Sequence, residues 1–432
     1  MSYSVSLFGL AVLALLFAGY IAQNRLPPPV PRIIGIDLGT TFSCVGAYHA
    51  KSGHVAILAD KRGRRVIPSV VAYDVSSRKW VVGEDAVMML KSNARNTFYD
   101  AKRFIGRSFE DIDLLDTKER YSFEVMNVNN SPYFGVEGGR PVSPEYVGSL
   151  ILSELKHTAE SRLGVVISKA VMSVPAEFDD RQRNATIKAA ELAGLEVLRV
   201  INEPTAASLA YGLNKKARVS NVLVVDVGGG TLDVSLLNVQ GGMFLTMAMA
   251  GNNRLGGQDF NQRLLTYVLG EIKRLYGVHV TNVNDLQRLS QAVESVKLDL
   301  TNKSVSRLPL TLSSLNGKEA KDLEISRRVF EEVNSDLFLK VLDPIKYVLQ
   351  TVEMDVTGVD EVVLVGGSTR IPKIRQLIRD FFGGKEPNVS VDPDLAVVSG
   401  VSLQAGIIGG AWPLQVAAVE RKRTGIKKFR IE

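Results

Sequence analysis

The sequence predicts an α/β protein built from two related halves. A buried apolar run that ends in aspartate, a turn of small residues and a second, alternating strand occurs twice, as IIGIDLGTTFSCVG at residues 33–46 and as VLVVDVGGGTLDVSLL at residues 222–237. The aspartates that end the two first strands, Asp37 and Asp226, lie nearly half the chain apart. This repetition indicates two halves of one plan, each of which offers a carboxylate and a loop of small residues.

Composition and charge fit an ordinary globular protein. Of the 432 residues, 45% are hydrophobic and 23% are charged, and the formal net charge is +6. The tail at residues 421–430 carries six lysines and arginines and no acid, so the rest of the chain is neutral, which argues against a nucleic-acid binder. We expect this tail to be solvated and mobile. A single cysteine, Cys44, permits no intrachain disulfide, and the four histidines lack the spacing of a zinc site.

The amino terminus has the character of a secretory signal. The first 24 residues contain no charged side chain, and residues 7–22 form an apolar run of 16. That length suits a signal core and falls short of the roughly 20 residues that span a bilayer. We expect a signal peptide at 1–22 and a linker at 23–32, with a retained signal anchor as the alternative. Either addresses the chain to the endoplasmic reticulum or microsomes, where glycosylation acceptors would matter; they occur at Asn129, Asn184, Asn302 and Asn388.

The second hairpin has the chemistry of a site for a metal-bound nucleotide. Glycines 228–230 let backbone N–H groups approach a phosphate closely. Asp226 and Asp233, on either side, would repel a bare phosphate but favour a cation carried with it. An ordinary hairpin is the alternative reading of this stretch alone. If the two halves face each other, both small-residue loops close on the phosphates from opposite sides.

The first half alternates strands and helices up to a carboxylate beside the second hairpin. Strand-like runs occur at 54–58, 69–73 and 169–174, and helical patterns at 84–93, 144–163 and 181–193. The stretch from Val200 then leads through Glu203 and Pro204 into a helix that stops at Gly212. Proline early in a helix suits its missing N–H, so Glu203 is predicted at a helix start.

The second half ends in a strand, a glycine loop and two helices. Helices are predicted at 261–276, 283–300 and 326–349, and an edge strand at 307–315. A buried strand from Glu361 runs into the loop Gly366–Ser368, where glycines let a flat ring approach the backbone. One more helix is predicted to end near Gly410.

Five motifs together resemble one known family. IGIDLGTT, YDAKRFIGR, INEPTAA, VVDVGGGTLDVS and VVLVGGSTRIPKI, in this order, resemble the ATPase domain of the stress-70 (seventy-kilodalton heat-shock) chaperones, in particular its truncated, microsome-associated branch. The resemblance implies an actin-like (ribonuclease H-like) bilobed fold that closes on MgATP, with a larger and a smaller subdomain in each lobe. We expect lobe I at 33–216, lobe II at 217–410, and a basic tail at 411–432 with no peptide-binding domain.

The resemblance also implies roles for individual residues. The phosphate loops would be Gly39, Thr40 and Thr41, and Gly228, Gly229, Gly230 and Thr231. Hydrated magnesium would be held by Asp37, Glu203 and Asp226, and monovalent cations, most naturally potassium, by Asp37 and Asp233. The catalytic set would be Lys102, which orients the attacking water, with Glu203, Asp226 and Thr231. Adenosine would lie between Gly366, Gly367, Ser368, Arg370 and Asp394 on one side and Glu294, Lys297 and Thr301 on the other.

The predicted function is peptide-independent binding and hydrolysis of ATP by a monomer that does not span the membrane once its signal is removed. A nucleotide-regulated binding module with slow hydrolysis is the second reading, and a sugar kinase of the same superfamily the third, although YDAKRFIGR and VGGSTRIPK disfavour a kinase. Unidentified protein partners are expected. Arg199, Asn202 and Thr205 match positions where the family docks J-domain partners, but the linker that completes that surface is missing here.

One departure from the family pattern gives a testable prediction. Leu298 stands where the family usually has an arginine that stacks on adenine. Because a stacked cation contributes about 0.5–2 kcal/mol, we expect Leu298→Arg to tighten ATP binding by a corresponding factor in a calorimetric titration. Leu298→Met, which stays apolar, should leave the affinity unchanged. An unchanged affinity for the arginine variant would show that Leu298 does not face the base.

Overall fold

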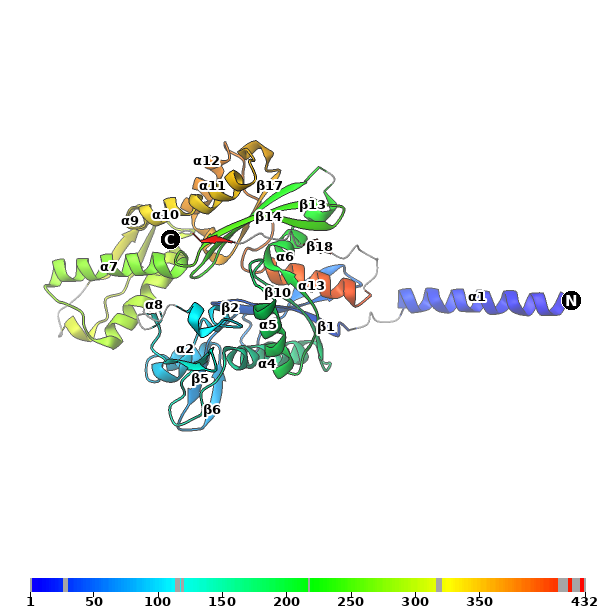
Figure 1. Ribbon diagram of the computed structural model, residues 1–432, viewed down its shortest axis with the longest axis horizontal. Helices are drawn as coiled ribbons and strands as arrows, with labels where there is room; N and C mark the ends of the chain where they lie inside the picture. Colours follow the sequence, from blue (N-terminus) through cyan, green and yellow to red (C-terminus); the bar gives the residue numbers. More distant parts are fainter. Residues whose placement is uncertain are drawn as a thin grey trace.

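The two predicted hairpins lie in two separate six-stranded sheets (Figure 1). The computed structural model describes residues 2–25, 30–112, 117, 120–216, 218–315, 321–410, 419–421 and 428–430. The first sheet contains β1 (Ile33–Leu38), β2 (Phe42–His49), β3 (His54–Ile57), β4 (Ile67–Pro68), β10 (Lys169–Val174) and β11 (Glu196–Asn202). The second contains β12 (Asn221–Val227), β13 (Leu232–Gln240), β14 (Met243–Asn252), β17 (Glu361–Val365), β18 (Val419–Arg421) and β19 (Phe429–Arg430).

The two sheets share one pattern of strand pairing. In the first, β1 pairs in parallel with β10 and antiparallel with β2, which pairs antiparallel with β3. In the second, β12 pairs in parallel with β17 and antiparallel with β13, which pairs antiparallel with β14. The mixed α/β class predicted from the repeated motif is therefore correct, and the repeat extends from the hairpins to the sheets around them.

A close helix contact lies between the two sheets. Helix α13 (Ala396–Ile408) packs on α6 (Glu203–Ala210) and also contacts β1, β2 and β10. The same buried cluster includes Val224 and Val363 of the second sheet and Ala206 and Val401 of the two helices. Gly400 allows the contact, because a Cβ atom there would lie 1.8 Å from the carbonyl oxygen of Ala206. This packing holds the carboxyl ends of β1 and β12 toward a common region.

Further helices pack on the two large sheets, on the small sheets and on one another (Figure 1). They are α2 (Glu84–Met89), α4 (Pro144–Leu163), α5 (Asp180–Leu192), α7 (Gly257–Tyr276), α8 (Val283–Leu300), α9 (Arg327–Val333), α10 (Ser335–Lys340), α11 (Leu342–Thr351) and α12 (Pro372–Phe381). Three small sheets complete the described fold, formed by β5 (Val71–Asp74), β6 (Lys79–Val82) and β7 (Thr97–Phe98), by β8 (Val125–Val128) and β9 (Ser131–Phe134), and by β15 (Val305–Leu308) and β16 (Leu323–Ser326).

Two predicted elements differ in the structure, and in both places a side chain forms a local hydrogen bond with or near the backbone. The single helix predicted over 326–349 is three helices, with a break at Asn334, whose buried side chain donates to the carbonyl of Phe330 at 2.9 Å. The edge strand predicted over 307–315 is only β15, because residues 313–315 form a 3-10 turn. In that turn the backbone N–H and hydroxyl of Ser313 both donate to Asp285.

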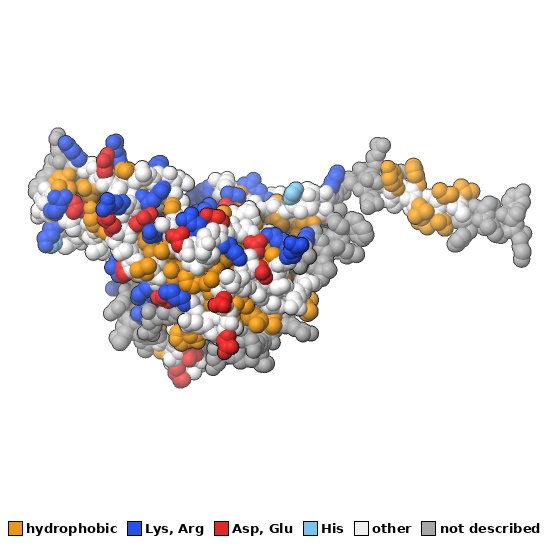
Figure 2. Space-filling view, turned by 90° about the horizontal axis from the view of Figure 1, so that it is seen from above, with side chains coloured by type: hydrophobic (Ala, Val, Ile, Leu, Met, Phe, Trp, Pro, Cys, Tyr) orange, Lys and Arg blue, Asp and Glu red, His pale blue; other side chains and the backbone are white. Residues whose placement is uncertain are grey.

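The amino-terminal segment is a helix, α1 (Ser2–Arg25), that extends away from the sheets in Figure 1. Its large apolar side chains between residues 9 and 20, the part whose side chains are described, are exposed, as the space-filling view in Figure 2 also shows. Leu13, Leu16 and Phe17 have exposed fractions of 66%, 68% and 65%. Within the described part of the chain, no helix has the combination of length and apolar character that crossing a bilayer requires.

The described residues of the carboxyl-terminal tail are docked on the second sheet, so the prediction of a solvated, mobile tail is wrong for them. Strand β18 pairs in parallel with residues 243–245 of β14, and β19 pairs in parallel with residues 250–251 of the same strand. The ring of Phe429 stacks on Tyr347, with centroids 4.1 Å apart and planes at 13°. Because the tail carries six positive charges, its composition alone predicts a solvated segment and gives no sign of these two strands.

The contact between α13 and α6 gives a stability test with a matched control. Gly400→Ala would force a methyl group against the backbone of α6, so we expect a loss of about 1–3 kcal/mol or more in the free energy of unfolding. Gly270→Ala, inside α7 with no atom near the added methyl group, should stabilise the protein by up to about 1 kcal/mol. Denaturant titration of both variants checks this, and equal effects would refute the tight packing.

Candidate functional site

The turns of the two hairpins meet beside an open cleft of about 490 Å³. A Cβ atom added at Gly229 would lie 2.5 Å from Oγ1 of Thr41, so the two loops are in direct contact. The predicted residues that line the cleft are Asp37, Gly39, Thr40, Thr41, Lys102, Glu203, Asp226, Gly228, Gly229, Gly230, Thr231, Asp233, Gly367 and Asp394. Loops from the two halves of the chain thus meet as the repeated motif predicts.

Four carboxylates reach the cleft from the ends of different elements. Asp226 and Asp233 are directly opposed partners of β12 and β13, which places both side chains on one face of the sheet. Asp37 lies near the end of β1 and accepts a hydrogen bond from Ser173 Oγ at 3.0 Å. Glu203 is the first residue of α6, as predicted. The sheets and the helix start therefore bring together acids that are far apart in sequence.

Burial raises the pKa values of three of these acids, Asp37, Glu203 and Asp226. Burial raises the pKa of Asp226 well above its ordinary value, and the charges of Asp233 and Glu203 raise it further. Burial also raises the pKa of Glu203 to about 7, although Lys102 lowers it. Burial likewise raises the pKa of Asp37. A bound cation would favour the ionised form of each carboxylate, so the residues present fit a metal-bound ligand.

Lys102 lies among these carboxylates. It belongs to the 3-10 turn η2 (Ala101–Arg103), and its Nζ lies 2.5 Å from Oε1 of Glu203. Burial lowers the pKa of Lys102, but Glu203 and Asp37 outweigh this effect, and the pKa lies above its usual value. Only 11% of the side chain is exposed. Lysine is usually a surface residue, but Lys102 is largely buried. It is a charged donor inside the cleft.

Arg103 is a site residue that the sequence argument missed. Its guanidinium donates to the carbonyl oxygen of Gly230 at 3.1 Å and to that of Asn253 at 3.2 Å, and its Nε donates to Asp100. It therefore ties the η2 turn of the first half to the glycine loop of the second. Only its place directly after Lys102 in YDAKRFIGR could have indicated it.

The predicted adenosine residues form two neighbouring walls beside the second hairpin. Ser368 Oγ donates to the carbonyl of Gly228 at 2.8 Å, which joins the Gly366–Ser368 loop to the glycine loop. Lys297 Nζ donates to the carbonyl of Gly257 at 3.2 Å and pairs with Glu294 at 2.8 Å. A Cβ atom at Gly257 would lie 2.8 Å from Ser368 Oγ and 3.1 Å from Lys297 Nζ, so the walls meet at this glycine.

Not every predicted adenosine residue faces the open cleft. Arg370 pairs with Asp394 at 3.0 Å and also with Asp392, and the Thr301 hydroxyl is oriented toward the carbonyl of Lys297 at 3.4 Å. The six predicted residues outside the lining of the cleft are Glu294, Lys297, Thr301, Gly366, Ser368 and Arg370. Leu298 is 58% exposed.

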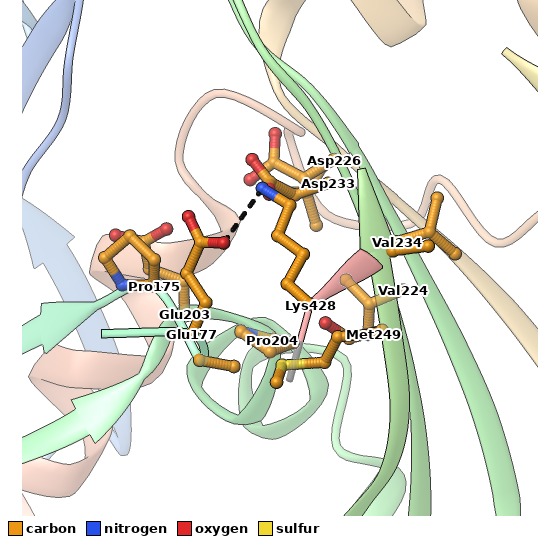
Figure 3. Close-up of a pocket in the computed structure, with 14 residues that line it drawn as sticks. Pro175, Glu177, Glu203, Pro204, Val224, Asp226, Asp233, Val234, Met249 and Lys428 are labelled. Atoms are coloured by element: carbon orange, nitrogen blue, oxygen red, sulfur yellow. Dashed lines mark hydrogen bonds and ion pairs between the residues drawn. The ribbon is translucent and has the colours of Figure 1, made fainter. Parts of the chain in front are cut away.

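Two further charged residues lie at the inner end of the cleft and were not predicted. Figure 3 shows Lys428, from the carboxyl-terminal tail, with its ammonium group between Asp233 and Glu177. Glu177 follows β10 and Pro175, and Lys428 Nζ lies 3.3 Å from its Oε2. Both residues line a small pocket of about 30 Å³ with Glu203, Asp226 and Asp233. Lys428 was not predicted as a site residue, because the run of like charges around it indicates a solvated tail.

The carboxylates are not arranged for direct ligation of a metal by several side chains at once. Over the residues that the structure describes, no group of three or more histidine, cysteine, aspartate or glutamate side chains is close enough to hold an ion. Mg²⁺ usually keeps several of its water molecules and binds to proteins through few direct ligands. The site therefore suits a hydrated ion better than a fully dehydrated one.

Comparison with known proteins identifies the class of protein. The family model described as Hsp70 protein matches residues 33–420. The chain belongs to this family, whose members have an actin-like ATPase fold and generally bind ATP or ADP with Mg²⁺. The stress-70 resemblance of the five motifs is confirmed.

Individual relatives match over almost their whole length. The chain is 50% identical to Heat shock 70 kDa protein 13 of Homo sapiens, 49% identical to that of Bos taurus and 48% identical to that of Mus musculus. Each alignment covers 99% of this chain and 99% of the relative.

The bridging role of Arg103 gives a prediction for nucleotide affinity. Arg103→Lys keeps the charge but cannot donate to both carbonyl groups in the same fork geometry. We expect ATP affinity to fall by roughly tenfold, about 1.4 kcal/mol, the scale of one charge-assisted hydrogen bond. Arg95→Lys, an exposed arginine on the preceding 3-10 turn, is the control. Fluorescent-nucleotide titration measures both, and an equal affinity in the two variants would contradict the bridge.

Proposed function

We propose that this chain binds MgATP in the cleft between the two hairpins and hydrolyses it to ADP and phosphate. The observation that carries the proposal is the convergence of Lys102, Asp37, Glu203 and Asp226 beside two touching loops of small residues. Phosphoryl transfer depends mostly on positioning and on neutralisation of charge, so donor loops, a metal held by carboxylates and one lysine form a sufficient set. No covalent nucleophile is needed.

The residues divide the work by their place in the cleft. The backbone N–H groups of residues 39–41 and 228–231 would donate to the phosphates, while Asp37, Glu203 and Asp226 hold magnesium through its water molecules. Bound magnesium would supply charge neutralisation on the phosphate oxygens. Lys102 would orient the attacking water, and Thr231 would contribute its hydroxyl group beside the reacting phosphate. Asp37 and Asp233 would serve monovalent cations, with potassium as the proposed ion.

The adenosine subsite is proposed at the junction of the two walls. The Gly366–Ser368 loop would lie against one face of the base, with Arg370 and Asp394 at its edge, and Glu294, Lys297 and Thr301 on the opposite wall. The approach of Gly257 to both Ser368 and Lys297 supports this arrangement. Leu298, which is exposed, would cover the ring only by apolar contact.

The wider assignments also remain proposals. We propose lobe I at 33–216 and lobe II at 217–410, hydrolysis that does not respond to peptide, a monomeric state and residence in the secretory pathway after removal of residues 1–22. The exposed apolar side chains of α1 support recognition of that helix by the secretory machinery. A J-domain partner is proposed only from the match of Arg199, Asn202 and Thr205, near which the carboxylate of Glu420, in β18, accepts from the backbone N–H of Asn202 at 2.8 Å.

Lys102→Ala separates catalysis from regulated binding. The variant removes the donor proposed to orient water but leaves both loops, so single-turnover phosphate release should fall by about 100-fold or more while ATP binding persists. Lys91→Ala, at an exposed position, is the control. If phosphate release is unchanged in the Lys102 variant, Lys102 is not catalytic. If the wild-type chain binds ATP without releasing phosphate, the alternative of a nucleotide-regulated binding module is correct.

A further inference from the structure

The carboxyl-terminal tail reaches the inner end of the cleft by pairing with the edge of the second sheet. Strand β14 pairs with β18 at residues 243–245 and with β19 at residues 250–251, so the described residues 428–430 lie beside the carboxyl end of that strand. Phe429, the residue after Lys428, stacks its ring on Tyr347 and so holds this part of the tail in place. The position of Lys428 is therefore set by backbone pairing and by an aromatic contact, and not by its charge alone.

The ammonium group of Lys428 is held by three oxygen atoms of the site. It forms ion pairs with Asp233 and, at 3.3 Å, with Glu177, and it lies 3.5 Å from the side-chain oxygen of Asn253. The side chain is only 5% exposed. An ammonium group that pairs with two carboxylates stays protonated at neutral pH, because lysine ordinarily loses its proton only far above pH 7. A positive charge is therefore held at this place.

The oxygen atoms that surround this buried ammonium group are also suitable ligands for a monovalent metal cation, which carries the same charge of +1. Asp233 is the residue proposed above for such a cation, and Lys428 already contacts its Oδ1. A second cation on the same carboxylate would be close to the ammonium group and repelled by it. Occupation of this place by Lys428 and by potassium is thus mutually exclusive.

We propose that Lys428 is a tethered cation that replaces the monovalent ion at Asp233. This inference rests on the proposed function only for the assignment of that ion site. It has a direct consequence for specificity: the intact chain needs no potassium at Asp233, and removal of the lysine charge creates a site that potassium fills. Phe429 has a positioning role, because its stacking on Tyr347 keeps the lysine in the cleft.

The test uses the full chain without nucleotide and measures its melting temperature in potassium chloride and in tetramethylammonium chloride at equal ionic strength. Wild type, in which only the proposed site at Asp37 remains for potassium, should show a smaller difference between the two salts than Lys428→Met. Lys428→Met should melt several degrees lower in tetramethylammonium chloride and recover in potassium chloride. Lys61→Met, at an exposed turn, should behave as wild type.

Two results would overturn the proposal: a potassium response in wild type as large as in Lys428→Met, or no response in that variant. If Lys428→Met does not fold, Phe429→Ala provides the second test, since it keeps the lysine but releases its anchor and should gain the same potassium response. If it gains none, the proposal fails. The measurement contains no ATP, so a chain that fails to bind ATP but shows the expected salt response would refute the proposed function alone.

ATP turnover gives a further check on the same variants. Under the proposal, Lys428→Met turns over ATP more slowly than wild type in tetramethylammonium chloride, and potassium restores the rate. A variant that is faster than wild type in both salts would show that the tail obstructs the cleft, and the tethered-cation role would be wrong.

Discussion

A cluster of carboxylates in one cleft is the constraint on which the rest of this structure depends. Asp37, Glu177, Glu203, Asp226 and Asp233 line the two adjoining pockets. Lys102 and Lys428 make the ion pairs observed with this group. Carboxylates taken out of water without enough positive charge have raised pKa values, as Asp226 and Glu203 do. Such a site is completed by added cations, and a polyphosphate that carries magnesium supplies them together with its own anionic groups.

The arrangement of the two sheets brings these carboxylates together, although they lie on different elements. Each hairpin ends its first strand in aspartate, and the shared pairing pattern of the two sheets gives both aspartates an equivalent place. The close packing of α13 on α6 then fixes one sheet relative to the other. Because α6 also begins with Glu203, the helix that joins the sheets adds an acid to the cleft. Stability and site geometry therefore rest on the same contact.

The sequence was most informative where a local pattern and a chemical requirement coincided. Both hairpins, the start of α6 and the cleft position of Lys102 follow from glycines, apolar runs and motif order. The break at Asn334 was not predicted, because it depends on the hydrogen bond of a buried side chain inside an otherwise helical pattern. The docking of Lys428 was missed for a different reason. Strand pairing with β14 and the contact between Phe429 and Tyr347 link residues far apart in sequence, and charge density alone favours a solvated tail.

Calorimetric titration of ATP into the chain with Mg²⁺ and with EDTA tests the central claim most directly. If the carboxylates of the cleft need a cation carried by the phosphates, ATP should bind with a 1:1 stoichiometry in Mg²⁺ and at least tenfold more weakly in EDTA, a difference of about 1.4 kcal/mol or more. Equal affinity under the two conditions would contradict the account, because free ATP would then meet the same acids without the ion that makes its binding favourable.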